Sequence, residues 1–205
     1  VQEACDPAIR RLSLTGTPFR SDDNPIPFVT YAPVGDGSIS SVADYSYGYG
    51  SALADGVVRP VLFMAYSGQM QWRTRAGDEA AARLGEPLTR DQAAQALRTA
   101  LDPEGSWILA VLEAAHKRLT EVRRDIADAG GMVIASDQES ARAYARLLAD
   151  MTDKEPTLVL SDESGSSAKI AEFSKGTSPW LVAVRMVSEG VDVPRLAVGV
   201  YATTV

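Results

Sequence analysis

Polar residues that stand just beyond apolar runs are the residues of this sequence best suited to bind a ligand. Ser136, Ser161, Arg185 and Ser188 each follow such a run closely. Their hydroxyl and guanidinium groups can all donate hydrogen bonds. In a parallel α/β sheet, ligands bind outside the carboxyl ends of the strands. If the apolar runs are strands of one sheet, these four side chains belong to one binding edge.

The second half of the chain alternates between apolar runs and helical patterns. The expected strands span residues 132–135, 157–160, 180–184 and 196–201. The expected helices span residues 78–84, 90–101, 106–129, 138–151 and 167–173, with Thr89 as the N-cap of the second. Strands separated by helices need crossover connections, which make a parallel sheet. The sequence therefore predicts an α/β fold with a mainly parallel sheet flanked by helices.

The first quarter of the chain lacks this alternation. Strands are expected at 8–15, before a turn, and at 57–66, where Pro60 indicates an edge strand. Between them, residues 20–56 are rich in Ser, Asp, Pro, Gly and Tyr and predict an irregular linker. Its tyrosines at 45, 47 and 49 either stack on bases or, as we favour, pack the linker against a lobe.

Composition limits the classes of function. The 205 residues carry a net charge of -7, which argues against coating nucleic acid through bulk charge but leaves room for a local basic groove. With one cysteine, Cys5, and one histidine, His116, a metal site or Cys/His catalysis has little support. No apolar run approaches membrane-spanning length and no signal peptide is visible, so we expect a cytoplasmic protein that makes no membrane contact.

Two motifs carry a resemblance to a known family. The segment Thr15-Gly16-Thr17-Pro18 follows an apolar run, and Glu189-Gly190-Val191-Asp192-Val193-Pro194 lies about 170 residues later. In this order they resemble motifs III and V of superfamily 2 DEAD/DEAH-box helicases of the restriction-enzyme-like group. The expected strand at 132–135 resembles motif IV. The resemblance covers nearly the whole chain and implies a RecA-like lobe preceded by a remnant of the first helicase lobe.

The resemblance implies roles for single residues. Thr15, Gly16 and Thr17 would couple the hydrolysis site to the other lobe. Glu189, Gly190 and Asp192 would bind ATP, with Gly190 letting the backbone approach the nucleotide and Asp192 accepting a hydrogen bond from the ribose. The residues expected to contact the phosphate backbone of a single DNA or RNA strand are Ser136, Ser161, Arg185 and Ser188. Ordinary turn or cap roles remain alternatives for each of these residues.

The resemblance also implies a domain plan and sets out what is missing. Residues 1–22 would end the first lobe, 23–56 would link the lobes, and 57–205 would form the second lobe, cut before motif VI. The sequence holds no phosphate loop, no acidic box for Mg²⁺ and no arginine motif. We therefore expect ATP and Mg²⁺ to act in an intact parent, with the first lobe as a partner, and expect no hydrolysis by this chain.

Two other classes of function stay open. A helicase-like lobe can serve as a non-enzymatic scaffold that binds protein or nucleic acid. A different α/β enzyme, such as a nucleotide or sugar transferase, would need a phosphate loop or a carboxylate cluster, and neither is seen in the sequence. The helicase interpretation explains both motifs and is the hypothesis we favour.

Overall fold

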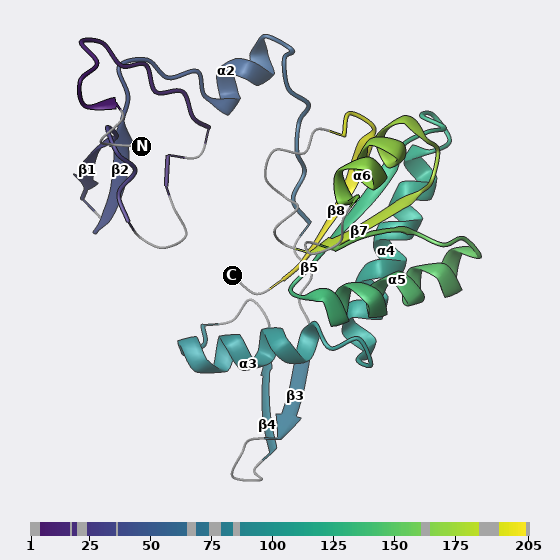
Figure 1. Cartoon of the computed structure of the whole chain (residues 1–205). Coiled ribbons are helices and arrows are strands. Elements are labelled where there is room, and N and C mark those ends of the chain that lie inside the picture. Colours follow the sequence, from purple (N-terminus) through teal and green to yellow (C-terminus); the bar gives the residue numbers. More distant parts are fainter. Residues whose placement is uncertain are drawn as a thin grey trace. The chain divides into compact units, whose positions relative to one another are not determined.

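The computed structural model divides the chain into two compact units, Val1–Phe63 and Met64–Val205. The structure describes residues 5–16, 18–19, 24–35, 37–64, 69–73, 79–83, 87–160, 165–184 and 193–203, with backbone only for 69–73 and 79–83. Each unit is described by itself, because their relative position is not determined (Figure 1). Among the described helices, none has the length and apolar character needed to cross a membrane.

The first unit contains a β-hairpin where the sequence predicted an irregular linker. Strand β1 (Thr30–Val34) pairs antiparallel with β2 (Ser38–Val42), and Gly37 at the turn has a positive φ of 87°. The prediction was wrong for these residues because β-branched side chains flank a Gly-containing turn, a pattern typical of hairpins. The short helix α2 (Tyr49–Ala54) follows.

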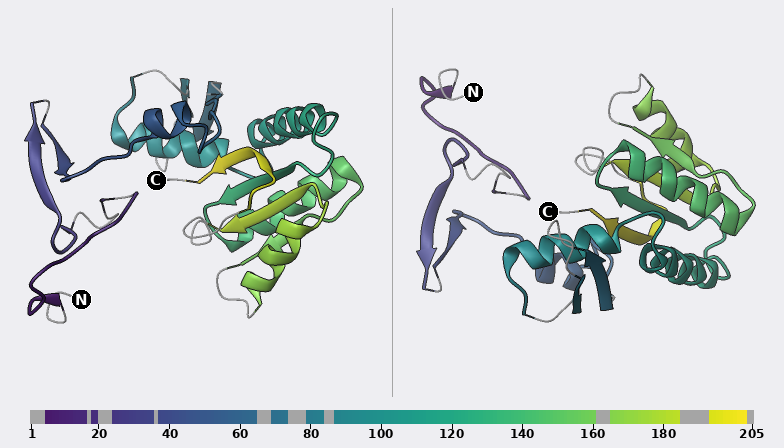
Figure 2. Two further views of the ribbon diagram at one scale, coloured as in Figure 1. Left: turned by 90° about the horizontal axis from the view of Figure 1, so that it is seen from above. Right: turned by 90° about the horizontal axis from the view of Figure 1, so that it is seen from below.

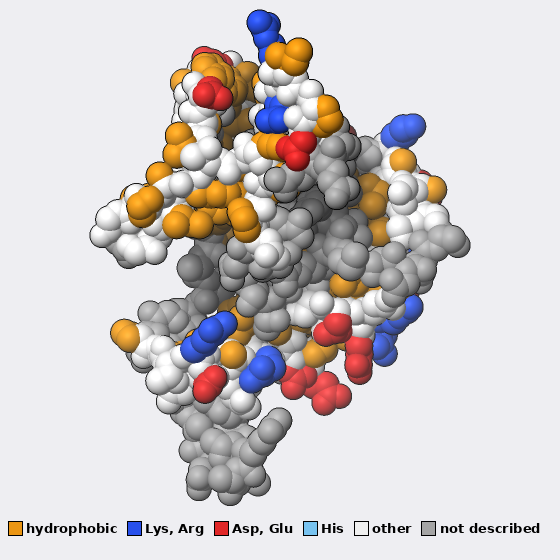
Figure 3. Space-filling view, turned by 60° about the vertical axis from the view of Figure 1, so that its left-hand side comes forward, with side chains coloured by type: hydrophobic (Ala, Val, Ile, Leu, Met, Phe, Trp, Pro, Cys, Tyr) orange, Lys and Arg blue, Asp and Glu red, His pale blue; other side chains and the backbone are white. Residues whose placement is uncertain are grey.

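Two apolar runs that were expected to be strands are not strands among the described residues. Residues 8–15 and 57–64 have no ladder partner, and their side chains are exposed: Leu12 is 84% and Phe63 93% accessible. A strand needs a neighbour that satisfies its N–H and C=O groups, so apolar composition alone does not make one. Figure 3 shows hydrophobic side chains gathered on the exposed face of this unit.

The second unit begins with another hairpin. Strand β3 (Gln69–Arg73) pairs antiparallel with β4 (Glu79–Arg83), so the helix predicted at 78–84 was wrong. Pairing with β3 outweighs the helix preference of alanine, which is a weak local term. The helix α3 (Arg90–Ala100) was predicted correctly. The Thr89 hydroxyl accepts a hydrogen bond from the backbone N–H of Gln92, and the Gln92 side chain accepts one from the N–H of Thr89.

Helix α4 (Ser106–Val122) ends seven residues before the point expected from its apolar spacing. The remaining residues form turns that lead into Gly130, the first residue of β5 (Gly130–Ala135). Arginine side chains hold these turns: Arg123 donates to the carbonyl oxygen of Ala129 at 2.6 Å, and Arg195 donates to that of Asp128. These bonds hold the turn just before β5, several residues beyond the end of α4.

The predicted parallel sheet is confirmed. It has the order β6-β7-β5-β8, and every neighbouring pair is parallel. The other strands are β6 (Thr157–Val159), β7 (Trp180–Val184) and β8 (Leu196–Ala202). Helix α5 (Gln138–Thr152) connects β5 to β6, and α6 (Ser166–Lys175) connects β6 to β7. The lobe therefore has the α/β arrangement expected of a RecA-like lobe.

Helices cover both faces of the sheet (Figure 2). The larger core joins α4 and α5 to β5, β7 and β8, and it buries Leu112, Tyr144, Leu148 and Val133. The smaller core lies under α6 and is built around Phe173. All five residues of β7 are buried, as expected of a central strand covered on both faces. This rigid lobe brings the carboxyl ends of its strands to one edge.

Candidate functional site

The carboxyl ends of three neighbouring strands finish in one register row. Ala135, the last residue of β5, pairs with Val184 of β7 on one side and with Ala202 of β8 on the other. The residues that come next along the chain are Ser136, Arg185 and Thr203. Strand neighbours lie about 4.8 Å apart, so this row brings the starts of three connections to a short stretch of the edge.

Ser136 is the predicted edge residue that the structure describes. It is half-buried and directly follows β5. The next residue, Asp137, is the N-cap of α5, and its side chain accepts a hydrogen bond from the backbone N–H of Ser140 at 2.8 Å. The edge therefore presents the first turn of a helix, whose end carries the partial positive charge that favours negative ligands, with one carboxylate already serving as its cap.

At the end of β6, the chain enters α6 through Gly165, which has a φ of 98°. The Ser166 hydroxyl donates to the carbonyl oxygen of Leu160 at 2.7 Å and ties the start of α6 to the strand end. Most predicted site residues of this unit, on the connections after β6 and β7, lie outside the described residues: Ser161, Arg185, Ser188, Glu189, Gly190 and Asp192. Their roles stay predictions.

The motif near the start of the chain lies in the first unit. Thr15 and Gly16 are in an exposed stretch that belongs to no helix or strand, and Thr17 lies outside the described residues. A Cβ added at Gly16 would meet no atom within 4 Å. The predicted strand that would hold this motif is not formed among the described residues 8–15, and the role of the motif stays a prediction.

Sequence reasoning missed Thr203 at this edge. Thr203 is a buried polar residue with 4% of its surface accessible, and it stands in the same row as Ser136. The rule that selected Ser136, a polar residue directly after an apolar strand, would also have selected Thr203. It was missed because the strand was expected to end at Tyr201, whereas β8 runs to Ala202.

Sequence reasoning also missed Arg195, which lies at the opposite, amino edge of the sheet. Arg195 is only 8% accessible, and its guanidinium stands 4.0 Å from the ring centre of Phe173. It donates to the carbonyl oxygens of Phe173, Asp128 and Ser178. Burial lowers the pKa of Arg195, nearby Arg123 lowers it further, and Asp128 opposes this. Because its partners are backbone carbonyls of three segments, Arg195 stabilises the lobe.

His116, the single histidine, lies on α4. It is half-buried, and its Nδ1 accepts a hydrogen bond of 3.4 Å from Nε1 of the buried Trp180. Of the arginines nearby, Arg118 pairs with Glu121 at 3.1 Å on the helix face, whereas Arg123 donates to the carbonyl oxygen of Ala129. Among the residues that the structure describes, no group of three His, Cys, Asp or Glu side chains could hold a metal ion.

Comparison with known proteins gives close relatives of unassigned role. The chain is 68% identical over 203 residues to the "Uncharacterized protein Rv2917" of Mycobacterium tuberculosis strain H37Rv. The matched residues make up 99% of this chain and 34% of that protein. It is 65% identical over 204 residues to the "Uncharacterized protein ML1624" of Mycobacterium leprae, with 34% of that protein covered. The chain thus spans about a third of the length of these curated relatives. No family model matches it.

Proposed function

We propose that this chain is the second-lobe portion of an ATP-dependent nucleic-acid helicase or translocase. The observation that carries the proposal is that the Glu189–Pro194 segment lies in the sequence between β7 and β8. These are the two strands that flank β5 in a parallel sheet. The last residue of β7, Val184, pairs with Ala135, the residue before Ser136, at the edge where α/β sheets bind ligands. An E-G-x-D-x-P sequence there agrees with the motif V resemblance.

In this proposal the edge has two tasks. Glu189, Gly190 and Asp192 bind ATP, and Ser136, Ser161, Arg185 and Ser188 hold the phosphates of one DNA or RNA strand. Contacts of this kind position a strand without reading its sequence. Thr15, Gly16 and Thr17 pass the nucleotide state between the lobes. The proposed activity is cytoplasmic.

The hydrolytic groups would belong to other parts of a longer parent. Phosphoryl transfer needs a phosphate-loop lysine, carboxylates for Mg²⁺ and an arginine that stabilises the transition state. This sequence has none of those motifs, and its relatives are about three times as long, which leaves room for them. The chain alone is therefore expected to bind ATP weakly and to turn over none. ATP turnover by the purified chain near the rate of an intact helicase would contradict this.

The nucleic-acid part of the proposal is tested by titrating a labelled single strand, DNA and RNA in turn, at several salt concentrations. Binding through phosphates weakens linearly on a log–log plot of affinity against salt, with a slope set by the number of phosphates neutralised. Arg185→Ala should reduce that slope by about 1. Arg146→Ala, on the exposed face of α5, is the matched control and should leave the slope unchanged.

A scaffold without enzymatic function is the second candidate, and one observation favours it. The first unit exposes several large apolar side chains in the 9–14 and 57–63 stretches, and clustered exposed apolar side chains of this kind often mark a protein interface. In the scaffold function, a protein partner would bind these apolar side chains and bury them. Partner binding that is independent of salt, together with no strand binding at low salt, would favour the scaffold over the motor.

A further inference from the structure

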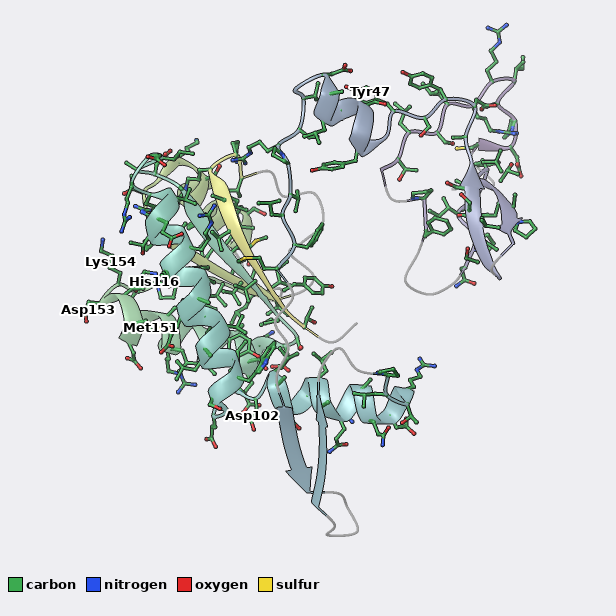
Figure 4. All side chains as sticks on the ribbon, turned by 180° about the vertical axis from the view of Figure 1, so that it is seen from behind. Tyr47, Asp102, His116, Met151, Asp153 and Lys154 are labelled. Atoms are coloured by element: carbon green, nitrogen blue, oxygen red, sulfur yellow. The ribbon has the colours of Figure 1, made fainter. Side chains whose placement is uncertain are left out.

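A pocket lies at the amino edge of the sheet, away from the edge used by the proposed function. It opens between the second half of α4, the end of α5 and the residue that precedes β7, and it is a shallow, solvent-open pocket of about 180 Å³. Its lining residues are His116, Leu119, Thr120, Arg123, Thr152, Lys154 and Pro179. Figure 4 shows His116 on α4 beside the end of α5 that leads to Lys154.

The charged and ionisable groups of the pocket are all hydrogen-bond donors. Arg123 is fixed by bonds to the carbonyl oxygens of Ala129 and Thr177, at 2.6 and 3.1 Å, which use two of its five N–H groups. The Nδ1 atom of His116 accepts from Trp180, so in the neutral ring the proton is on Nε2, which then donates. Lys154 adds an exposed ammonium group. No Asp or Glu is among the lining residues.

The end of α4 does not oppose an anion as strongly as a bare helix end would. Carbonyl groups in a last turn carry partial negative charge unless a donor covers them. Here the carbonyl oxygens of Glu121 and Val122 accept hydrogen bonds from the backbone N–H groups of Arg124 and Ile126, at 3.2 and 2.9 Å. The backbone N–H of Arg123 bonds to the carbonyl oxygen of Leu119 at 2.9 Å. Several carbonyl groups at this edge are therefore occupied.

Three cationic side chains lie at this edge: Arg123 and Lys154, which line the pocket, and Arg195. Arg195 lies close enough to Arg123 for the two guanidinium groups to repel each other, and both bind carbonyl oxygens, which leave their charge in place. Asp128 offsets part of this charge. Asp153 and Glu155 flank Lys154 in the sequence and are exposed. The charged side chains that line the pocket itself are both cationic, so a small negative group that enters meets Arg123 and Lys154 before any carboxylate.

We propose that this pocket binds a small phosphate monoester, with its phosphate held by Arg123, His116 and Lys154 and its organic body on Leu119 and Pro179. Three donor side chains suit the three terminal oxygens of a phosphate. Leu119 and Pro179 provide apolar wall for a ring or short alkyl group. The site is separate from the ATP and strand edge, so it exists whether or not the chain belongs to a helicase.

The test uses phenyl phosphate as the probe, titrated into the 205-residue chain at constant ionic strength. Amide resonances are followed by NMR and affinity by calorimetry. We expect a Kd of about 1 mM, typical of a shallow charged site, with shifts centred on Thr120, Arg123 and Lys154. Benzoate should bind more weakly, and inorganic phosphate should give the same shifts at higher concentration. Shifts that avoid the pocket, or no binding at about 20 mM probe, overturn the proposal.

Matched variants separate the pocket from general charge attraction. Lys154→Ala should weaken phenyl phosphate binding about three- to fivefold, as expected for an exposed charged contact. Lys117→Ala removes the same charge from an exposed position on α4 outside the pocket and should leave the Kd unchanged. Equal weakening by both variants would show attraction without a site and overturn the proposal. Amide spectra of both variants check that the fold is kept.

Discussion

The indole of Trp180 packs so closely on the backbone of Gly131 that a Cβ at residue 131 would lie 2.4 Å from its Cζ3 atom. The two residues are partners in the β5–β7 ladder, and Trp180 is 1% accessible. The glycine is therefore required by its neighbour, because the backbone of β5 must leave room for the largest side chain of the core.

Gly131→Ala should lower the free energy of unfolding by about 3 kcal/mol, because neither the buried ring nor the paired strand can move without loss of packing. Gly199→Ala is the matched control in β8, where an added Cβ meets no atom within 4 Å, and it should be neutral or slightly stabilising. Urea unfolding followed by circular dichroism measures both. A Gly131→Ala protein as stable as the parent would show that the ring has space to move.

Arg195→Met should lower the free energy of unfolding by at least about 3 kcal/mol, because three backbone carbonyl groups lose a buried donor. Arg118→Met removes an exposed pair with Glu121 and should cost less than about 1 kcal/mol. Thermal and urea unfolding of the two variants give the comparison. Similar losses would mean that the carbonyl groups at the amino edge find water instead.

Tyr144 should make the lobe sensitive to alkaline pH. Burial, with Asp137 and Asp102 nearby, raises the pKa of Tyr144 from 10.0 to about 12, and its hydroxyl donates to the carbonyl oxygen of Leu101 at 2.6 Å. The folded state holds this proton more tightly than the unfolded state. The stabilisation is therefore complete below pH 10 and is lost as pH rises towards 12.

The variant Tyr144→Phe should be less stable at neutral pH by about 1–2 kcal/mol, because the Leu101 carbonyl group loses its donor. It should also show a flatter loss of stability between pH 10 and 12 than the parent chain. Unfolding midpoints in urea at several pH values measure both effects. If the unfolding midpoints of the two proteins fall equally between pH 10 and 12, the loss of stability at alkaline pH comes from groups other than Tyr144.

Asp153 ends α5 in the left-handed region with a φ of 51°, a conformation that favours glycine. Asp153→Gly should raise the free energy of unfolding by about 0.5–1 kcal/mol. Asp150→Gly makes the same change three residues earlier, inside the helix, and should lower it by about 1 kcal/mol. A destabilising Asp153→Gly would show that the carboxylate makes a compensating contact.

The second half of the fold could be predicted because its signals agree with one another. The apolar run at 132–135 is followed by Asp137, a good N-cap, and then by a helical pattern, so strand, cap and helix indicate one βα unit. Residues 57–64 had only their apolar composition to indicate a strand, and residues 79–83 had only their alanine content to indicate a helix. An apolar run without a ladder partner stays out of a sheet, and an alanine-rich segment with a partner strand enters one.

The sheet edge could be predicted from the sequence, but not every residue that lies at it, and the binding roles stay predictions. The rule for parallel sheets correctly indicated an edge after β5, β6 and β7, because strand direction follows from the alternation of elements. Thr203 was missed because β8 ends one residue later than the sequence predicted. Arg195 had no local signal at all, since its partners come from three separate segments: Asp128 from a turn, Phe173 from α6 and Ser178 from the stretch before β7.

The separation of those partners has a consequence for the order of folding. The bonds of Arg195 join segments 17, 22 and 67 residues away, so they form only after β5, α6 and the entry to β7 are in place. Contacts completed after the transition state affect the rate of unfolding more than the rate of folding. We therefore expect Arg195 to set how long the folded lobe survives, while the speed at which it forms depends on the local βα units.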